Sequence, residues 1–329
     1  MKLTTKTALA TMALAAAILP HGKVFSADPR TYVGGRFSLD IMGANAGFLK
    51  SFSGGGAVAD IVQANAPREA TTAKQVVNTG YSDIQFQIGV DLGKPAASWI
   101  MDSFNNTSPV GLDREGAILV LDMDGKARRR VDFTEGYITE LKFPDLDAQQ
   151  REVGFLSVTI SPGTVDLNLK GNNKIVEPVS TKQKQWLTSN FRFRLGDLPC
   201  GRVTKIENVK ITRQLAEVQV GEGREVQVST LRPEYSNLTL TINAIDLEPW
   251  ALWYQNFLVE GQNADADELD GSIELLDRDL KKVLGTIELK GVGMKAFHPF
   301  PSEDSASESV KRFKVELYVE EMALNLNHL

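Results

Sequence analysis

The best candidates for metal ligands in this chain are two aspartates, Asp122 and Asp124. They precede Gly125 in the stretch REGAILVLDMDGKARRR. This spacing resembles the start of a calcium loop, which spreads oxygen ligands over about twelve residues and ends in a bidentate acid. Here the glycine is followed by the basic run KARRR (126–130), which would repel a cation. Asp-x-Asp-Gly between two apolar stretches is also typical of a tight hairpin turn. We therefore predict a hairpin turn and no metal, and interpret the basic run as a solvated or edge-protecting strand face.

No other group of residues indicates catalysis. The three histidines are His21, His298 and His328, and their number and spacing exclude a site with several histidine ligands. A Ser-His-Asp arrangement would depend on His298 and has no other support. Cys200 is the single cysteine, so no intrachain disulfide is possible, and we interpret it as an inert thiol. We predict no catalytic, cofactor-binding or metal-binding residue, no cofactor and no enzymatic activity.

Length and charge limit the class of protein. The chain has 329 residues, of which 42% are hydrophobic and 24% are charged, as in globular proteins of up to two ordinary domains. The net charge of −6 and the pI of about 5.3 argue against a protein that coats nucleic acid.

The N-terminal stretch MKLTTKTALATMALAAAIL has the layout of a secretory signal, with Lys2 and Lys6 before an Ala-rich apolar segment. It is too short to span a bilayer, and no other segment is apolar enough to do so. The alternative is a flexible or helical arm, and both interpretations of residues 1–33 stay open.

The sequence repeats itself. Three pairs share an offset of 154 residues: Tyr81 with Tyr235, Pro95 with Pro249, and Trp99 with Trp253. Four more pairs share an offset of 155: Gly116 with Gly271, Asp122 with Asp277, Asp124 with Asp279, and Lys126 with Lys281. Further upstream, Arg36 matches Arg192 at an offset of 156. We predict two copies of one domain, residues 34–175 and 188–329, joined by a linker at 176–187.

Each copy is predicted to be mainly β with one helix. Stretches such as DIQFQIGV and LTLTINAI alternate polar and apolar residues, as strands do. The helix falls between the second and third strands, with Pro95 or Pro249 in its first turn, where proline is tolerated. Apolar residues at helical spacing predict that each helix packs on its sheet. These helix-core residues are Trp99, Ile100 and Phe104 in the first copy and Trp250, Trp253 and Phe257 in the second.

The order of these stretches is similar to that of the tail-tube protein family of contractile phage tails and phage-tail-like injection systems. It runs through GRFSLDIMGANAGFLKSFSGGGAVADIV, YSDIQFQIGV, REGAILVLDMDGK and FLSVTISPG. The resemblance covers nearly all of 34–165 and recurs more weakly over 191–329. It implies tandem tail-tube-like β-barrel or sandwich domains, each with one short flanking helix. It also implies six-membered rings that stack into a hollow tube, through which DNA or an effector passes without specific binding.

The resemblance further implies that a long loop or hairpin packs on neighbouring subunits. Here it corresponds to residues 53–79 and 214–230. The candidate assembly residues are the apolar ones in these segments: Val58, Ile61, Val62, Val76, Val77, Val218, Val220, Val226 and Val228. Apolar residues that a solitary domain would bury are expected to serve self-association.

Two tandem copies in one chain predict either a trimer with pseudo-sixfold symmetry or a hexamer, because a heterologous interface closes by rotation. The expected function is that of a structural tube or hub subunit, with tail sheath and baseplate proteins as partners and no membrane. The expected location is a tail or injection particle assembled in the cytoplasm. The alternative is an exported tandem β-sandwich binding module, if the leader is a cleaved signal.

Overall fold

The computed structural model describes residues 37–64, 73–90, 92–106, 111–122, 124–168, 175–176, 186–220, 225–299 and 311–326. These belong to one compact unit, residues 31–329. The leader at 1–33, for which two interpretations were open, lies outside the described residues, as does most of the linker at 176–187.

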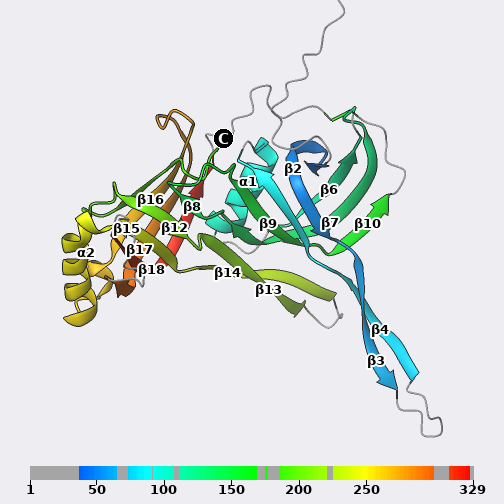
Figure 1. Cartoon of the computed structure of the whole chain (residues 1–329). Helices are drawn as coiled ribbons and strands as arrows, with labels where there is room; N and C mark the ends of the chain where they lie inside the picture. The colour runs from blue at the N-terminus through cyan, green and yellow to red at the C-terminus, as the bar shows by residue number, and fades with distance from the viewer. Residues whose placement is uncertain are drawn as a thin grey trace, which may run out of the picture. The chain divides into compact units, whose positions relative to one another are not determined.

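The first half of the chain forms a closed six-stranded barrel (Figure 1). The strands follow the order β7-β6-β1-β2-β5-β9, and a pairing between β7 and β9 closes the ring. Their bounds are β1 (Phe37–Ile41), β2 (Ala44–Gly54), β5 (Ile84–Gly89), β6 (Arg114–Leu121), β7 (Ala127–Lys142) and β9 (Phe155–Ser161), with β10 (Thr164–Asn168) beside β7. The sequence of β9 alternates, and its Leu156, Val158 and Ile160 are fully buried. The barrel therefore encloses a packed core.

The second half forms an open sheet with the same strand order. The order is β11-β16-β17-β18-β15-β12, which matches β1-β6-β7-β9-β5-β2 position by position. Their bounds are β11 (Phe191–Leu195), β12 (Val203–Glu207), β15 (Leu238–Asn243), β16 (Leu269–Leu276), β17 (Val283–His298) and β18 (Arg312–Asn325). Where β1 and β2 pair, β11 and β12 do not, and β12 instead pairs with β8 (Leu146–Asp147) from the first half.

Two hairpins complete the strands. The first hairpin, β3 (Ala57–Ala64) and β4 (Ala73–Tyr81), is a two-stranded sheet of its own. The second hairpin, β13 (Lys210–Val220) and β14 (Glu225–Tyr235), holds the corresponding place in the second half but joins the sheet of the first half through β7. Strands thus cross between the halves in both directions.

One helix follows β5 in the first half and β15 in the second, which are the strands of DIQFQIGV and LTLTINAI, as expected; β2 and β12, which precede them, were not predicted. In α1 (Lys94–Asn105), Pro95 lies in the first turn, and the buried Trp99 donates its indole N–H to the Leu112 carbonyl oxygen at 2.9 Å. In the second half, η1 (Ala244–Asp246) leads into α2 (Leu247–Tyr254), which continues as a π-helical turn, η2 (Gln255–Val259). A further 3-10 turn, η3 (Asp265–Asp267), precedes β16. The prediction of a mainly β chain with one flanking helix in each half is confirmed. The first half is a closed barrel, whereas the second is an open sheet of the same strand order.

Four of the predicted helix-core residues are almost fully buried: Trp99, Phe104, Trp250 and Phe257. Ile100 is also buried, whereas Trp253 is partly buried and lies at an angle to two aromatic neighbours, with ring centroids 5.9 Å from Trp250 and 5.7 Å from Phe257. Each helix contacts its sheet through a tryptophan: the rings of Trp99 and Phe133 in β7 lie 6.2 Å apart, and those of Trp250 and Phe313 in β18 lie 6.4 Å apart.

The repeated glycines Gly116 and Gly271 mark a close approach of backbones at the same point in both sheets. A Cβ at Gly116 would lie 2.5 Å from the Asp40 carbonyl oxygen, and one at Gly271 would lie 2.3 Å from the Arg194 carbonyl oxygen. A strand glycine in such a place is required by packing rather than by backbone conformation.

We therefore expect Gly116→Ala to lower the free energy of unfolding by about 1–3 kcal/mol, because the methyl group forces two strands apart. Gly80→Ala is the matched control, since a Cβ there meets nothing within 4 Å. It should change stability by less than about 0.5 kcal/mol. Urea denaturation followed by circular dichroism measures both, and equal effects of the two substitutions would contradict the packing explanation.

Candidate assembly surface

The stretch around Asp122 is a hairpin turn, as predicted, and joins β6 to β7. One carboxylate oxygen of Asp122 accepts the N–H groups of Asp124 and Lys126, both at 2.9 Å. The other accepts the Arg128 Nε–H at 2.7 Å. Gly125 has the left-handed φ of +74° that closes the turn. The carboxylate is thus used to hold the turn together.

The second half keeps this turn. Asp277 accepts the N–H groups of Lys281 at 3.3 Å and Lys282 at 3.2 Å. Leu280 stands where the first half has Gly125, and it adopts φ +58°. Across the described residues, no group of three or more histidine, cysteine or acidic side chains is arranged to hold a metal.

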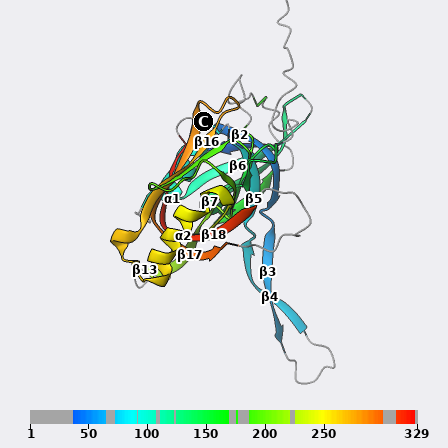
Figure 2. The same ribbon diagram turned by 60° about the vertical axis from the view of Figure 1, so that its left-hand side comes forward.

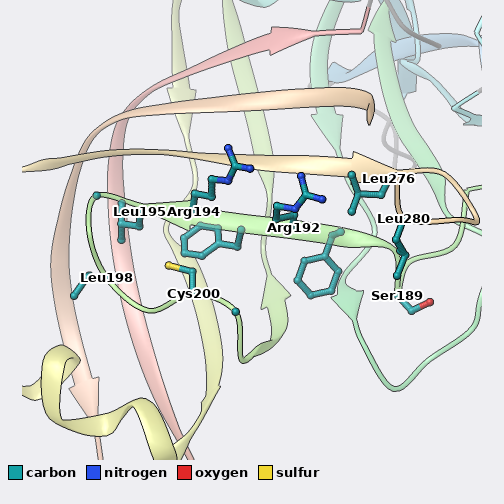
Figure 3. A pocket seen from close by; sticks show the side chains of 12 residues that line it. Ser189, Arg192, Arg194, Leu195, Leu198, Cys200, Leu276 and Leu280 are labelled. Atoms are coloured by element: carbon teal, nitrogen blue, oxygen red, sulfur yellow. The ribbon is translucent and has the colours of Figure 1, made fainter. Parts of the chain in front are cut away.

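A hollow of about 550 Å³ lies along β11 at the open side of the second sheet (Figure 3). Its two guanidinium groups, Arg192 and Arg194, both pair with Glu274, at 2.6 and 3.6 Å. Cys200 also lines it, and burial raises the pKa of this thiol to about 11. The thiol is therefore protonated at neutral pH, and the two positive charges already have a structural partner.

The first hairpin extends away from the barrel (Figures 1 and 2). It carries the five assembly candidates of the first half, each more than half exposed: Val58, Ile61, Val62, Val76 and Val77. Ile61 and Val76 face each other across the two strands. A two-stranded hairpin is only marginally stable alone in water, and exposed apolar residues on it are the kind of surface that self-association would use, so their assembly role stays a prediction.

Matching hydrogen bonds fix the base of each hairpin. Gly56 donates its N–H to the Ser82 hydroxyl at 3.2 Å, and the Ser82 N–H donates to the Gly56 carbonyl at 2.9 Å. In the second hairpin, Lys210 donates to the Ser236 hydroxyl at 3.0 Å, and the Ser236 N–H donates to the Lys210 carbonyl at 3.0 Å. Gly56 and Lys210 therefore occupy equivalent places.

The second hairpin is docked. Residues 210–212 pair antiparallel with residues 140–142 of β7, with Ile211 opposite Leu141, and both of these side chains are fully buried. We call this pairing the internal joint. Of the four candidates predicted here, Val228 is half-buried, and its carbonyl accepts the Tyr137 hydroxyl at 3.5 Å. The side chains of Val218, Val220 and Val226 lie outside the described residues, although their backbones belong to β13 and β14.

Side chains that the sequence did not single out form further contacts between the two halves of the chain. The Asn105 side chain donates to the Leu324 carbonyl at 2.6 Å and accepts the Leu324 N–H at 2.8 Å. The buried guanidinium of Arg213 donates to the Asn106 carbonyl at 2.9 Å and to the Thr230 hydroxyl at 3.0 Å. No motif marks Asn105, although its place at the end of a predicted helix favours a capping or bridging role.

No protein-family model and no curated protein sequence matches the chain. A chain of the sheath–tube complex of an extracellular contractile injection system (PVC), in its extended state, is similar in structure. It is 17% identical, with 42% of this chain and 88% of that chain covered and a TM-score of 0.33. The tube-terminating cap of the anti-feeding prophage is 18% identical, with 45% and 95% covered and a TM-score of 0.32. Hcp1 from Flavobacterium johnsoniae is 14% identical, with 42% and 99% covered and a TM-score of 0.28.

The helices in the described part of the chain include none that is both long and apolar enough to cross a bilayer.

The pKa of the Asp122 carboxyl is lowered from 3.8, chiefly by the N–H of Lys126; partial burial opposes this and Arg128 adds to it. Because the pKa is lowered on folding, the charge stabilises the fold above pH 3.8 and ceases to do so as the pH falls through the folded pKa. Asp122→Asn should therefore lower Tm at pH 7, and the difference from the natural chain should shrink below about pH 4.

The control is Asp124→Asn, because the Asp124 carboxylate is exposed and lies 4.0 Å from the nearest lysine nitrogen, that of Lys126. Its Tm should follow that of the natural chain at every pH. A constant Tm deficit of Asp122→Asn down to pH 2 would show that the lost charge is not the cause.

Asn105→Ala removes both bonds to the backbone of Leu324 and should lower the free energy of unfolding by about 1–2 kcal/mol. Ser98→Ala, on the exposed face of the same helix, should change it by less than about 0.5 kcal/mol. Equilibrium denaturation of both variants provides the comparison. If Asn105→Ala is as stable as Ser98→Ala, then water replaces the bridge without cost.

Proposed function

We propose that this chain is a structural subunit of the tube, hub or cap of a contractile tail or injection particle, built from two tandem copies of a ring-forming domain. It acts by assembling and not by catalysis. Three chains form one ring, in which six similar domains surround a channel. Rings or partner proteins then stack on it through loops and hairpins.

The single observation that carries this proposal is the internal joint. The second hairpin adds a strand to the sheet of the first half, which is a heterologous contact between two domains of the same strand order. The first hairpin has the same base and is exposed, so each chain has one such contact made and one hairpin available. A heterologous contact repeated by rotation closes a ring.

Composition supports the same proposal. Residues 34–175 carry 14 basic and 17 acidic side chains, and residues 188–329 carry 16 and 23, so both halves are acidic. An acidic channel wall would repel a polyanion and let it pass without binding. The proposed partners are further copies of this chain and the sheath and baseplate proteins of the particle.

The test is negative-stain electron microscopy with native mass spectrometry on the full chain at high concentration. We expect rings or stacked rings with the mass of three chains per ring. The double variant Ile61→Asp/Val76→Asp should remain a single chain with an unchanged circular dichroism spectrum, because burying two unpaired carboxylates in an apolar contact is prohibitive.

Ile245→Asp is the matched control, since Ile245 is 71% exposed but lies beside α2 and outside both hairpins. This variant should still assemble. A natural chain that stays a monomer at every accessible concentration would refute the proposed function.

A further inference from the structure

The edge of β7 that receives the second hairpin has a counterpart in β17. β6 pairs with β7 as far as Gly136. Further along the same edge of β7, residues 140–142 pair with β13. β16 pairs with β17 as far as Val292. Beyond it, residues 296–298 pair with β18 on the other side, and no strand within the described ranges occupies the side that β16 has left. We call residues 296–298 the open edge.

Two structural features show that the open edge matches the docked one. Pairing with the neighbouring strand ends at Gly136 in β7 and at Val292 in β17. These residues are 156 apart, which is also the offset between the first residues of β7 and β17, Ala127 and Val283. A register shift follows at Thr139 in β7 and at Lys295 in β17, again 156 apart. Residues 296–298 therefore correspond to residues 140–142.

The chain also contains the strand that would fill this edge. Residues 210–212 fill the edge of β7, and the matching bonds to Ser82 and Ser236 make residues 56–58 their equivalents in the first hairpin. In the chain itself the first hairpin pairs with neither barrel sheet. The occupant of the open edge is thus the first hairpin of a second copy.

We infer that residues 56–58 of one chain pair antiparallel with residues 296–298 of the next, with Gly56 opposite His298, Ala57 opposite Phe297 and Val58 opposite Ala296. This inference rests on the proposed ring and adds the surface and register by which it closes. Each chain offers one hairpin and one open edge, so the contact is head to tail.

Side-chain sizes across the two joints compensate. In the internal joint, Ile211 faces Leu141 and both are fully buried. In the inferred joint, the smaller Ala57 would face the larger Phe297, which is only partly buried in the single chain. Ala57 is exposed as well, so both positions have surface left to bury.

The inferred joint is one hydrogen bond shorter than the internal one. Phe143 donates its N–H to the Val209 carbonyl at 2.9 Å, just beyond the three paired residues. At the corresponding position the second half has Pro299, which has no N–H to donate. The pairing therefore ends at His298, and the contact between chains is weaker than the contact within a chain.

Disulfide trapping in the full chain tests this register. All variants carry Cys200→Ser, which removes the single cysteine. Val58→Cys with Ala296→Cys places two cysteines directly opposite. Ala59→Cys with Ala296→Cys is the control, because side chains alternate along a strand and Ala59 points to the other face. Under mild oxidation, the first pair should link chains into a product of up to three chains, with a yield about tenfold above that of the control.

Hydrogen exchange on the natural chain gives a second measurement that needs no cysteine. Amides of residues 56–58 and 296–298 should exchange more slowly in the assembled ring than in the Ile61→Asp/Val76→Asp single chain. If the disulfide fails to form, protection of both segments still supports the pairing of residues 56–58 with residues 296–298.

Rings that form with no Val58–Ala296 disulfide and no protection of these amides would overturn the register and leave the proposed function standing. Rings in which the Ala59–Ala296 disulfide forms in preference to the Val58–Ala296 disulfide would also overturn the register and leave the proposed function standing. A natural chain that never assembles would instead overturn the proposed function, and this inference with it.

Discussion

A mismatch in strand length is the constraint on which the rest of this structure depends. β7 has 16 residues and its neighbour β6 has 8, so β7 extends beyond the partner that satisfies its backbone. Backbone N–H and carbonyl groups left inside a protein need other partners, and an exposed strand edge is a template for pairing. The second hairpin satisfies this edge of β7. β17 and β16 repeat the mismatch with the same lengths, 16 and 8 residues.

The difference between the closed and the open barrel has a local cause. In the first half, β1 and β2 are joined by Met42 and Gly43, which both adopt positive φ and form a tight hairpin turn. In the second half, seven residues that include Pro199 separate β11 from β12, and β12 is only five residues long against eleven in β2. Without a tight turn the two strands diverge. The freed edge of β12 then accepts β8 of the first half, which is a second tie between the halves.

The sequence was sufficient for the features that depend on side-chain type. Alternation predicted the strands, Pro95 and Pro249 predicted the start of each helix, and Asp122 with Gly125 predicted the hairpin turn between β6 and β7. The repeat of 154–156 residues suggested one strand order used twice, and the two sheets have that order. The bounds of the two tandem domains remain a prediction, since residues 31–329 form one compact unit.

The sequence could not predict which strands pair between the two halves, and the reason is physical. The internal joint spans three residues, and its bonds come from backbone groups that every residue type except proline provides equally. No pattern in residues 210–212 distinguishes pairing with β7 from pairing with any other edge. The role of Asn105 could not be predicted for the same reason. Its side chain binds the backbone of Leu324, so no complementary side chain marks the site in the sequence.

In the proposed ring two domains share one chain, and this linkage would change how the ring assembles. A contact within a chain forms at the high effective concentration that covalent linkage gives, whereas a contact between chains requires encounter. In the proposed ring, half of the six joints form on folding, and the stronger joint, with Phe143 as an additional donor, is one of these. The joint ended by Pro299 forms last, so folding precedes assembly. The apolar first hairpin must stay accessible for that step, and it accordingly pairs with neither of the two larger sheets of its own chain.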